Sequence, residues 1–178
     1  MPMLQPRLQQ CFFDCADLLY QAAEPLARPL SDAVQAITAG LTAGGKLLVC
    51  GGPLAGHAAA LLVGGFERER PPLAALAIAA EPTPLRALGH PGDLLLLLDD
   101  GLAVPAVLAL LAAAHAQDMT VIALSGDAPA WLAGLTETDV LVAVPHERAA
   151  RVRELHLLML HALADAIDVQ LLGEQEPA

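Results

Sequence analysis

The chain has 178 residues, 56% of them hydrophobic, and a formal net charge of −11 at pH 7. This length predicts one domain that buries about 70% of the surface exposed by the unfolded chain. The negative charge, with Lys46 as the only lysine, excludes a surface that neutralises nucleic-acid phosphates, because such binding needs clustered cations. We expect no membrane span, since the longest apolar stretch, 102–114, contains Pro105 and is shorter than the ~20 residues required.

Three cysteines, Cys11, Cys15 and Cys50, are too few for a disulfide framework, and none belongs to a Cys-x-x-Cys pair. This favours a reducing compartment, and we expect the cysteines to pack as small apolar side chains. Arg7 and Asp14 stand where a secretory signal would be apolar. The sequence therefore predicts a cytoplasmic protein, and no pattern in it predicts a cofactor or a metal site.

The first 42 residues predict an N-terminal pair of helices. Apolar residues recur at helical spacing over 4–23, and Pro25 and Pro29 limit this first helix. Ser31 is typical of the residue that precedes a helix, so a second helix is expected to run from there towards Leu41.

The pattern then changes to short, continuous apolar runs, which are typical of strands covered on both faces. The expected strands are 46–50, 73–79, 93–98, 120–124 and 140–144. Helical stretches lie between them at 54–66, 103–117 and 129–134, and a last helix covers about 146–172. We predict a three-layer α/β/α fold with a five-stranded parallel sheet. As one domain over 1–178, it would comprise the N-terminal helices (1–42), the α/β core (45–145), the C-terminal helix (146–172) and a solvated tail (173–178).

Two glycine turns follow expected strands and precede expected helices, which is the layout of an anion or sugar site. The first turn begins Cys50-Gly51-Gly52, and the second begins Asp99-Asp100-Gly101. Ligands of such folds gather at the carboxyl ends of the strands. The candidate ligand-binding residues are Gly51, Gly52, Ala55, Asp99, Asp100 and Ser125.

Five segments, taken together and in order, resemble the SIS (sugar isomerase) family. The resemblance is to the phosphoheptose isomerase subgroup, which includes the DnaA initiator-associating proteins. The segments are 45–51, 66–71, 86–93, 118–126 and 148–156. The resemblance implies a Rossmann-like fold and assembly into a homo-oligomer, a dimer or a tetramer.

The candidate phosphosugar loops depart from this family. Its phosphosugar-binding members have a Cys-Gly-Asn-Gly-x-Ser turn, but Gly52 and Ala55 stand here at the Asn and Ser positions. Their second loop is rich in hydroxyls, where this chain has Asp99 and Asp100. A carboxylate about 4 Å from a phosphate repels it by roughly 1 kcal/mol in water and by several in a cleft. We therefore expect phosphosugar binding to be lost.

The resemblance also implies a carboxylate and a histidine that move protons beside a carbonyl. His161 matches the family's histidine, but no carboxylate precedes Glu67 in the expected helix after the first turn. An element of the family between Ala79 and Leu88 is also missing. His161 is thus a vestigial candidate. His57 could contact a ligand, but we expect it to be exposed or packed.

Other charged residues admit several interpretations. Asp99 and Asp100 could cap a turn, hold a metal or contact another ligand. Arg148, Arg151 and Arg153 form a positive cluster at the start of the last helix, the unfavourable end for cations, so an acid should lie nearby.

The departures favour a non-catalytic, oligomeric scaffold similar to the DnaA initiator-associating proteins. Its partner would be the replication initiator, and Leu171 and Leu172 are the candidate partner-binding residues. One alternative is a phosphoheptose isomerase whose acid–base group has moved to Glu67 or Asp99. Another is a sensor that binds an uncharged or cationic sugar derivative.

Overall fold

A computed structural model describes residues 4–174 and contains one five-stranded sheet, in which every strand pairs parallel to its neighbours. The strand order is β2-β1-β3-β4-β5. The strands are β1 (Leu47–Cys50), β2 (Ala75–Ala77), β3 (Leu94–Leu98), β4 (Thr120–Ser125) and β5 (Val140–Ala143). Each lies within or close to one of the predicted apolar runs, so the predicted parallel sheet is confirmed.

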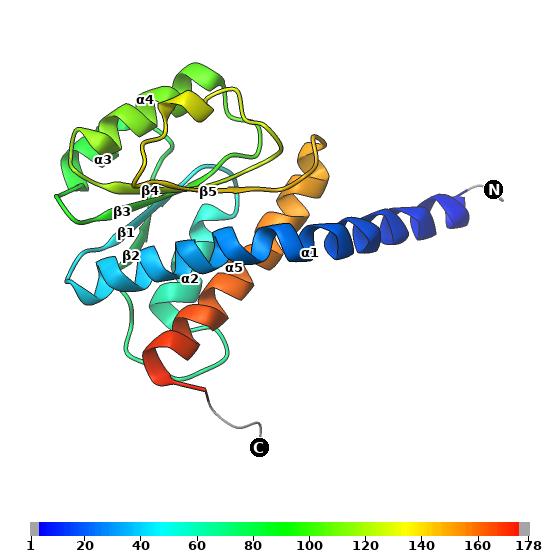
Figure 1. The fold of residues 1–178 in the computed structure, drawn as a ribbon, viewed down its shortest axis with the longest axis horizontal. Coiled ribbons are helices and arrows are strands. Elements are labelled where there is room, and N and C mark those ends of the chain that lie inside the picture. Colours follow the sequence, from blue (N-terminus) through cyan, green and yellow to red (C-terminus); the bar gives the residue numbers. More distant parts are fainter. Residues whose placement is uncertain (1–3, 175–178) are drawn as a thin grey trace.

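Helices cover both faces of the sheet and make the fold three-layered (Figure 1). One face carries α1 (Leu4–Thr42), α2 (Ala55–Gly64) and α5 (Ala149–Leu172). The other carries α3 (Pro82–Leu88), α4 (Val104–His115) and the short 3-10 helix η1 (Leu132–Gly134). Alternate residues of β1, β3 and β4 enter one core or the other, which explains why these central strands are mostly apolar.

The expected N-terminal pair of helices is a single helix, and this expectation was wrong. α1 runs for 39 residues and passes through Pro25 and Pro29. A proline removes one helical hydrogen bond, but Pro25 is exposed, so water can reach the carbonyl that loses its donor. The buried residues Leu18, Ala22 and Leu26 continue at spacings of four through this region, and their packing keeps the helix intact.

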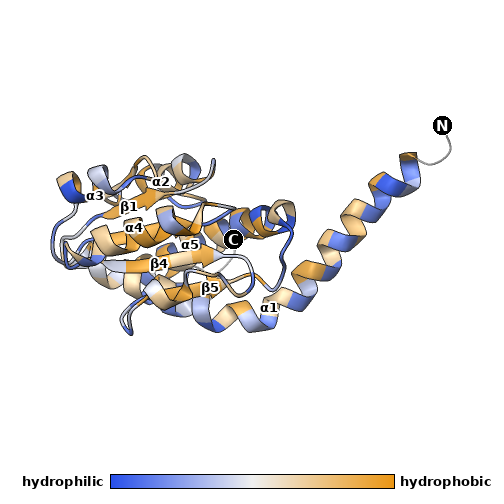
Figure 2. Ribbon diagram, turned by 90° about the horizontal axis from the view of Figure 1, so that it is seen from above, coloured by the Kyte–Doolittle hydropathy of each residue, from blue (hydrophilic) through white to orange (hydrophobic). Residues whose placement is uncertain are grey.

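The N-terminal part of α1 extends away from the rest of the molecule (Figure 2). Residues 4–14 are all exposed, and Leu4, Leu8 and Phe12 follow one another at intervals of four. This spacing places the three side chains on one side of the helix.

The helix α3 was not predicted. Pro82 is the first residue of this helix, where its fixed backbone angle is favourable and its missing N–H costs no bond. Leu85 of this helix is fully buried against α4 and the sheet.

The amino ends of β1 and β3 are joined through Asp93, which is almost fully buried. Its carboxylate accepts hydrogen bonds from the backbone and side chain of Lys46 and from the backbone of His90. Burial raises the pKa of Asp93, but these hydrogen bonds outweigh it and lower the pKa below its ordinary value. A depressed pKa stabilises the fold while the carboxylate is ionised, and this contribution is lost as the pH falls through the folded-state pKa.

By length and composition alone, α5 could cross a membrane, and it is the only such helix within residues 4–174. In the structure one side of α5 is buried in the core through residues such as Val152, Leu155, Met159 and Leu163. Its apolar character is therefore explained by packing against the sheet and α1.

Candidate functional site

The two predicted glycine turns meet at the carboxyl ends of β1 and β3, where the strand order changes direction. Ligands of open α/β sheets bind at such switch points. Gly51 directly follows β1 and has a φ of 87°, and a Cβ placed there would lie 2.2 Å from the carbonyl oxygen of Leu98. The first turn is therefore in backbone contact with the end of β3, where the second turn begins, and only a glycine at position 51 permits this.

Gly52 contacts the side chain of Asp100. A Cβ built at Gly52 would lie 2.9 Å from the Asp100 carboxylate, whose side chain is 12% exposed. Arg153 of α5 donates from Nε to the same carboxylate at 2.7 Å. This is the compensating acid predicted for the arginine cluster. Arg151 likewise pairs with Glu154.

Asp99 holds the second turn together. Its carboxylate accepts hydrogen bonds from the backbone of Gly101 (3.1 Å) and Leu102 (2.9 Å) and from the indole of Trp131 (2.6 Å). Of the three interpretations of this residue, the geometry supports the cap of a turn. Among residues 4–174, no three His, Cys, Asp or Glu side chains gather in a way that could hold a metal.

An open cleft of about 200 Å³ lies beyond the carboxyl ends of β3 and β4. Asp99 and Asp100 line it together with Asp127 and Glu147, so its walls are acidic. Ser125 does not line it, because its buried hydroxyl donates to the carbonyl of Gly126 at 2.9 Å. Ala55 is buried at the start of α2 and offers no polar group.

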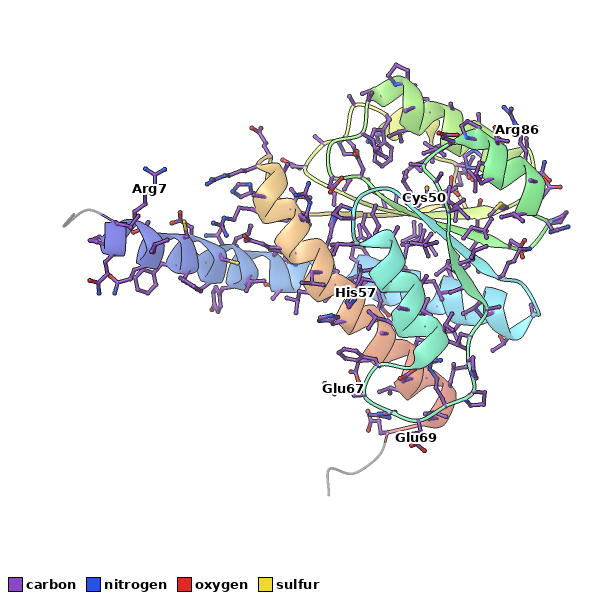
Figure 3. The ribbon with its side chains drawn as sticks, turned by 180° about the vertical axis from the view of Figure 1, so that it is seen from behind. Arg7, Cys50, His57, Glu67, Glu69 and Arg86 are labelled. Carbon is purple, nitrogen blue, oxygen red and sulfur yellow. The ribbon has the colours of Figure 1, made fainter. Side chains whose placement is uncertain are left out.

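His161 is separate from this cleft and pairs with a second histidine. Its Nε2 lies 3.0 Å from Nε2 of His57, and the two rings meet edge to face with centroids 5.2 Å apart. Phe66, on the loop after α2, stacks on the ring of His161 at a centroid distance of 5.1 Å. Figure 3 shows His57 on α2, on the side that faces α5.

Sequence reasoning missed this pair. We expected His57 to be exposed or packed, but it is half-buried and hydrogen-bonded to the one histidine that matches the family. The two residues are 104 positions apart, and only the packing of α2 on α5 brings them together. No local pattern in the sequence indicates that contact.

A hydrogen bond between two Nε2 atoms needs one nitrogen that carries a proton and one with a free lone pair. The pair therefore holds one proton between its rings. Histidine is the side chain that ordinarily gains and loses a proton near neutral pH. The arrangement can accept a proton at one ring and donate one from the other.

Asp99 and Glu67, the two other residues proposed as an acid–base group, have different surroundings from the histidine pair. Asp99 is held by three donors in its turn, as described above. Glu67 is exposed on the loop after α2 (Figure 3).

The two candidate partner-binding residues differ in exposure. Leu171 packs against the core, whereas Leu172 is 42% exposed.

Comparison with known proteins gives both the class and the family. No family model matches the chain. A phosphoheptose isomerase from Methylibium petroleiphilum is 49% identical over 198 residues, and the match covers 99% of each chain. One from Aromatoleum aromaticum is 40% identical over 192 residues and covers 96% of this chain and 97% of the relative.

Solved structures agree with these relatives. The phosphoheptose isomerase of Neisseria gonorrhoeae superposes with a TM-score of 0.81 at 32% identity, covering 93% of this chain and 99% of the other. That of Francisella tularensis superposes with a TM-score of 0.83 at 28% identity, covering 92% and 97%. The fold is therefore that of the SIS sugar isomerases. Within this class, the chain belongs to the phosphoheptose isomerase family.

These findings overturn the hypothesis of a non-catalytic scaffold, because the relatives are named as enzymes. Association with the replication initiator finds no support among them. The match to the Methylibium relative spans 198 residues, although this chain has only 178, so about twenty positions of the relative have no counterpart here. This agrees with the expectation that the chain lacks an element of the family.

Proposed function

We propose that the chain is a sugar-phosphate isomerase with the activity for which its relatives are named, the interconversion of phosphorylated seven-carbon aldose and ketose sugars. The observation that carries the proposal is the position of His161. It matches the family's histidine and lies half-buried beside the first turn of α2, in contact with a second titratable side chain.

The first turn of α2 is a suitable place for the substrate's phosphate. Backbone N–H groups at the start of a helix are without helical partners and attract anions. The repulsion expected from Asp99 and Asp100 is reduced, because Arg153 neutralises Asp100 and three donors stabilise Asp99. Asp127 and Glu147 are acids on the far side of the cleft, towards β4 and α5, and favour a phosphate placed near α2 instead.

The proposal is tested by the conversion of sedoheptulose 7-phosphate. The purified protein should form the aldose product, and His161→Gln should lower kcat by about 10²-fold or more, the usual contribution of a general acid or base. His90→Gln is the matched control, since His90 is an exposed histidine near the amino end of the sheet. Absence of product with the unaltered protein would contradict the proposal.

We also propose that the protein forms a homo-oligomer through the N-terminal part of α1. A helical segment of this length is marginal on its own in water, and here it exposes Leu8 (54%) and Phe12 (77%). The same segment of a second copy would bury these side chains. The cytoplasmic location and the lack of nucleic-acid binding stay predictions from composition.

Sedimentation measures this association directly. The unaltered chain should sediment as a dimer or tetramer, and Leu8→Glu/Phe12→Glu should sediment as a smaller species, because charged side chains oppose burial. Gln9→Glu adds a charge to the same segment at a position that is already polar and should leave the assembly intact. A monomeric unaltered chain, or a double variant of unchanged size, would show that α1 does not form the interface.

A further inference from the structure

The loop that joins α2 to β2 is held against α5 at two points. Phe66 stacks on the ring of His161 at an interplanar angle of 23°. Further along the loop, Arg70 donates to the carboxylate of Asp168. We propose that Arg70 is a positioning residue of the isomerase, because its ion pair with Asp168 fixes the loop that places Phe66. This inference rests on the proposed function, in which His161 transfers the proton.

The two anchor points lie on the same side of α5. His161 and Asp168 are seven residues apart, which is about two helical turns and about 10.5 Å along the helix axis. The chain advances four residues from Phe66 to Arg70 and so reaches at most about 14 Å. Little slack remains between the anchors, and the position of Arg70 therefore limits where Phe66 can lie.

The rest of the loop is loosely packed. It surrounds an open hollow of about 490 Å³ that is lined by its own residues, 64–70. Glu67 and Glu69, both labelled in Figure 3, are exposed on it. Gly65, directly before Phe66, has a φ of 84° and lacks the side chain that would restrict its backbone. The ring of Phe66 thus depends on the far end of the loop for its position.

The side chain of Arg70 suits an anchor and not a substrate contact. It is 1% exposed, so a sugar cannot reach it. Besides Asp168, its guanidinium donates to the carbonyls of Leu61 and Leu62 at the carboxyl end of α2. Arginine can serve several acceptors because its planar group offers five donors in a fixed arrangement. One buried side chain thus joins the loop, α2 and α5, the helix that carries His161.

The stack of Phe66 on His161 restricts the rotation of the histidine ring. A histidine that transfers protons must hold its nitrogen within hydrogen-bond reach of the reacting atoms. A displacement of about 1 Å can slow such a reaction by about 10²-fold. Arg70 therefore acts on kcat through the position of Phe66, without touching the sugar.

The kinetic test uses Arg70→Met/Asp168→Leu, which removes the ion pair without leaving a buried charge. This double variant should fold, yet its kcat for sedoheptulose 7-phosphate should fall about 10- to 10²-fold with little change in KM. Arg68→Met is the matched control on the same loop, because Arg68 makes only an exposed hydrogen bond, and it should leave kcat unchanged. Phe66→Leu should slow the reaction by a similar factor, and adding it to the double variant should cause little further loss.

Nuclear magnetic resonance separates this inference from the proposed function, because it needs no sugar. The ring current of Phe66 shifts the ring-proton signals of His161. These signals should move in the double variant and also in Asp168→Asn, which keeps the shape of the pair but removes its negative charge. They should stay in place in Arg68→Met.

Unaltered His161 signals and unaltered kcat in the double variant and in Asp168→Asn would overturn the positioning role of Arg70 and leave the isomerase proposal standing. An unaltered protein that converts no sugar would instead contradict the proposed function. In that case a shift of the His161 signals would still show that Arg70 places Phe66.

Discussion

Arg70→Met is expected to lower the free energy of unfolding by about 3–5 kcal/mol, the usual cost of removing one partner from a buried ion pair. The side chains of Arg70 and Asp168 are each 1% exposed, and the guanidinium donates from Nε to the carboxylate. Arg70 also donates to the carbonyls of Leu61 and Leu62, at the carboxyl end of α2. The substitution leaves all these acceptors without their donor.

The effect should appear in chemical denaturation and as a fall of about 10 °C in the unfolding midpoint. Oδ2 of Asp168 already has no hydrogen-bond partner among the described residues, so loss of Arg70 leaves an uncompensated buried charge. Arg70→Met/Asp168→Leu should regain much of the lost stability, because two apolar side chains replace the pair without burying a charge.

Arg68→Met is the control for Arg70→Met. Arg68 donates only to the carbonyl of Gly173 from an exposed position, and its loss should cost less than about 1 kcal/mol. Equal losses for Arg68→Met and Arg70→Met would contradict this account.

Gly51→Ala is expected to destabilise the fold by about 3 kcal/mol or more. A side chain at a φ of 87° costs about 1–2 kcal/mol, and the contact of its Cβ with the Leu98 carbonyl adds about 1–3 kcal/mol. The obstacle is backbone, so no rotamer change can relieve it. Because the substitution separates the two turns, isomerase activity should fall with stability.

Gly56→Ala, in the same segment, is expected to stabilise the fold instead. A Cβ at Gly56, inside α2, meets nothing within 4 Å. Alanine is favoured over glycine inside a helix, so this variant should be about 0.5–1 kcal/mol more stable than the unaltered chain. Thermal unfolding of the two variants side by side checks both statements. A Gly51→Ala protein as stable as Gly56→Ala would show that the turns can move apart.

The parallel sheet could be predicted from the sequence because its three central strands, β1, β3 and β4, are buried on both faces. Such strands are continuous apolar runs, and β3 consists of five consecutive leucines. The continuity of α1 could not be predicted in the same way. Proline is a local signal, whereas the packing of Leu18, Ala22 and Leu26 that overrides it depends on residues far along the chain.

The location of the site at the strand ends was predictable, but the side-chain contacts within it were not. The glycine turns and their place at the strand ends follow from local patterns. The ion pair of Asp100 with Arg153 joins residues 53 positions apart, and the contact of His57 with His161 joins residues even further apart. The missing family carboxylate indicated a lost activity, whereas the contact of His57 with the family's histidine forms only when α2 packs against α5.

The contact between Gly51 and Leu98 involves only backbone atoms, so the arrangement of the two loops does not depend on the side chains that line the site. Main-chain atoms alone fix how the two loops abut, so the side chains around them are free to diverge. Relatives can thus differ in the side chains of the loops, with acids in place of hydroxyls, while the backbone beneath keeps its shape. The same junction can serve catalysts with quite different functional groups.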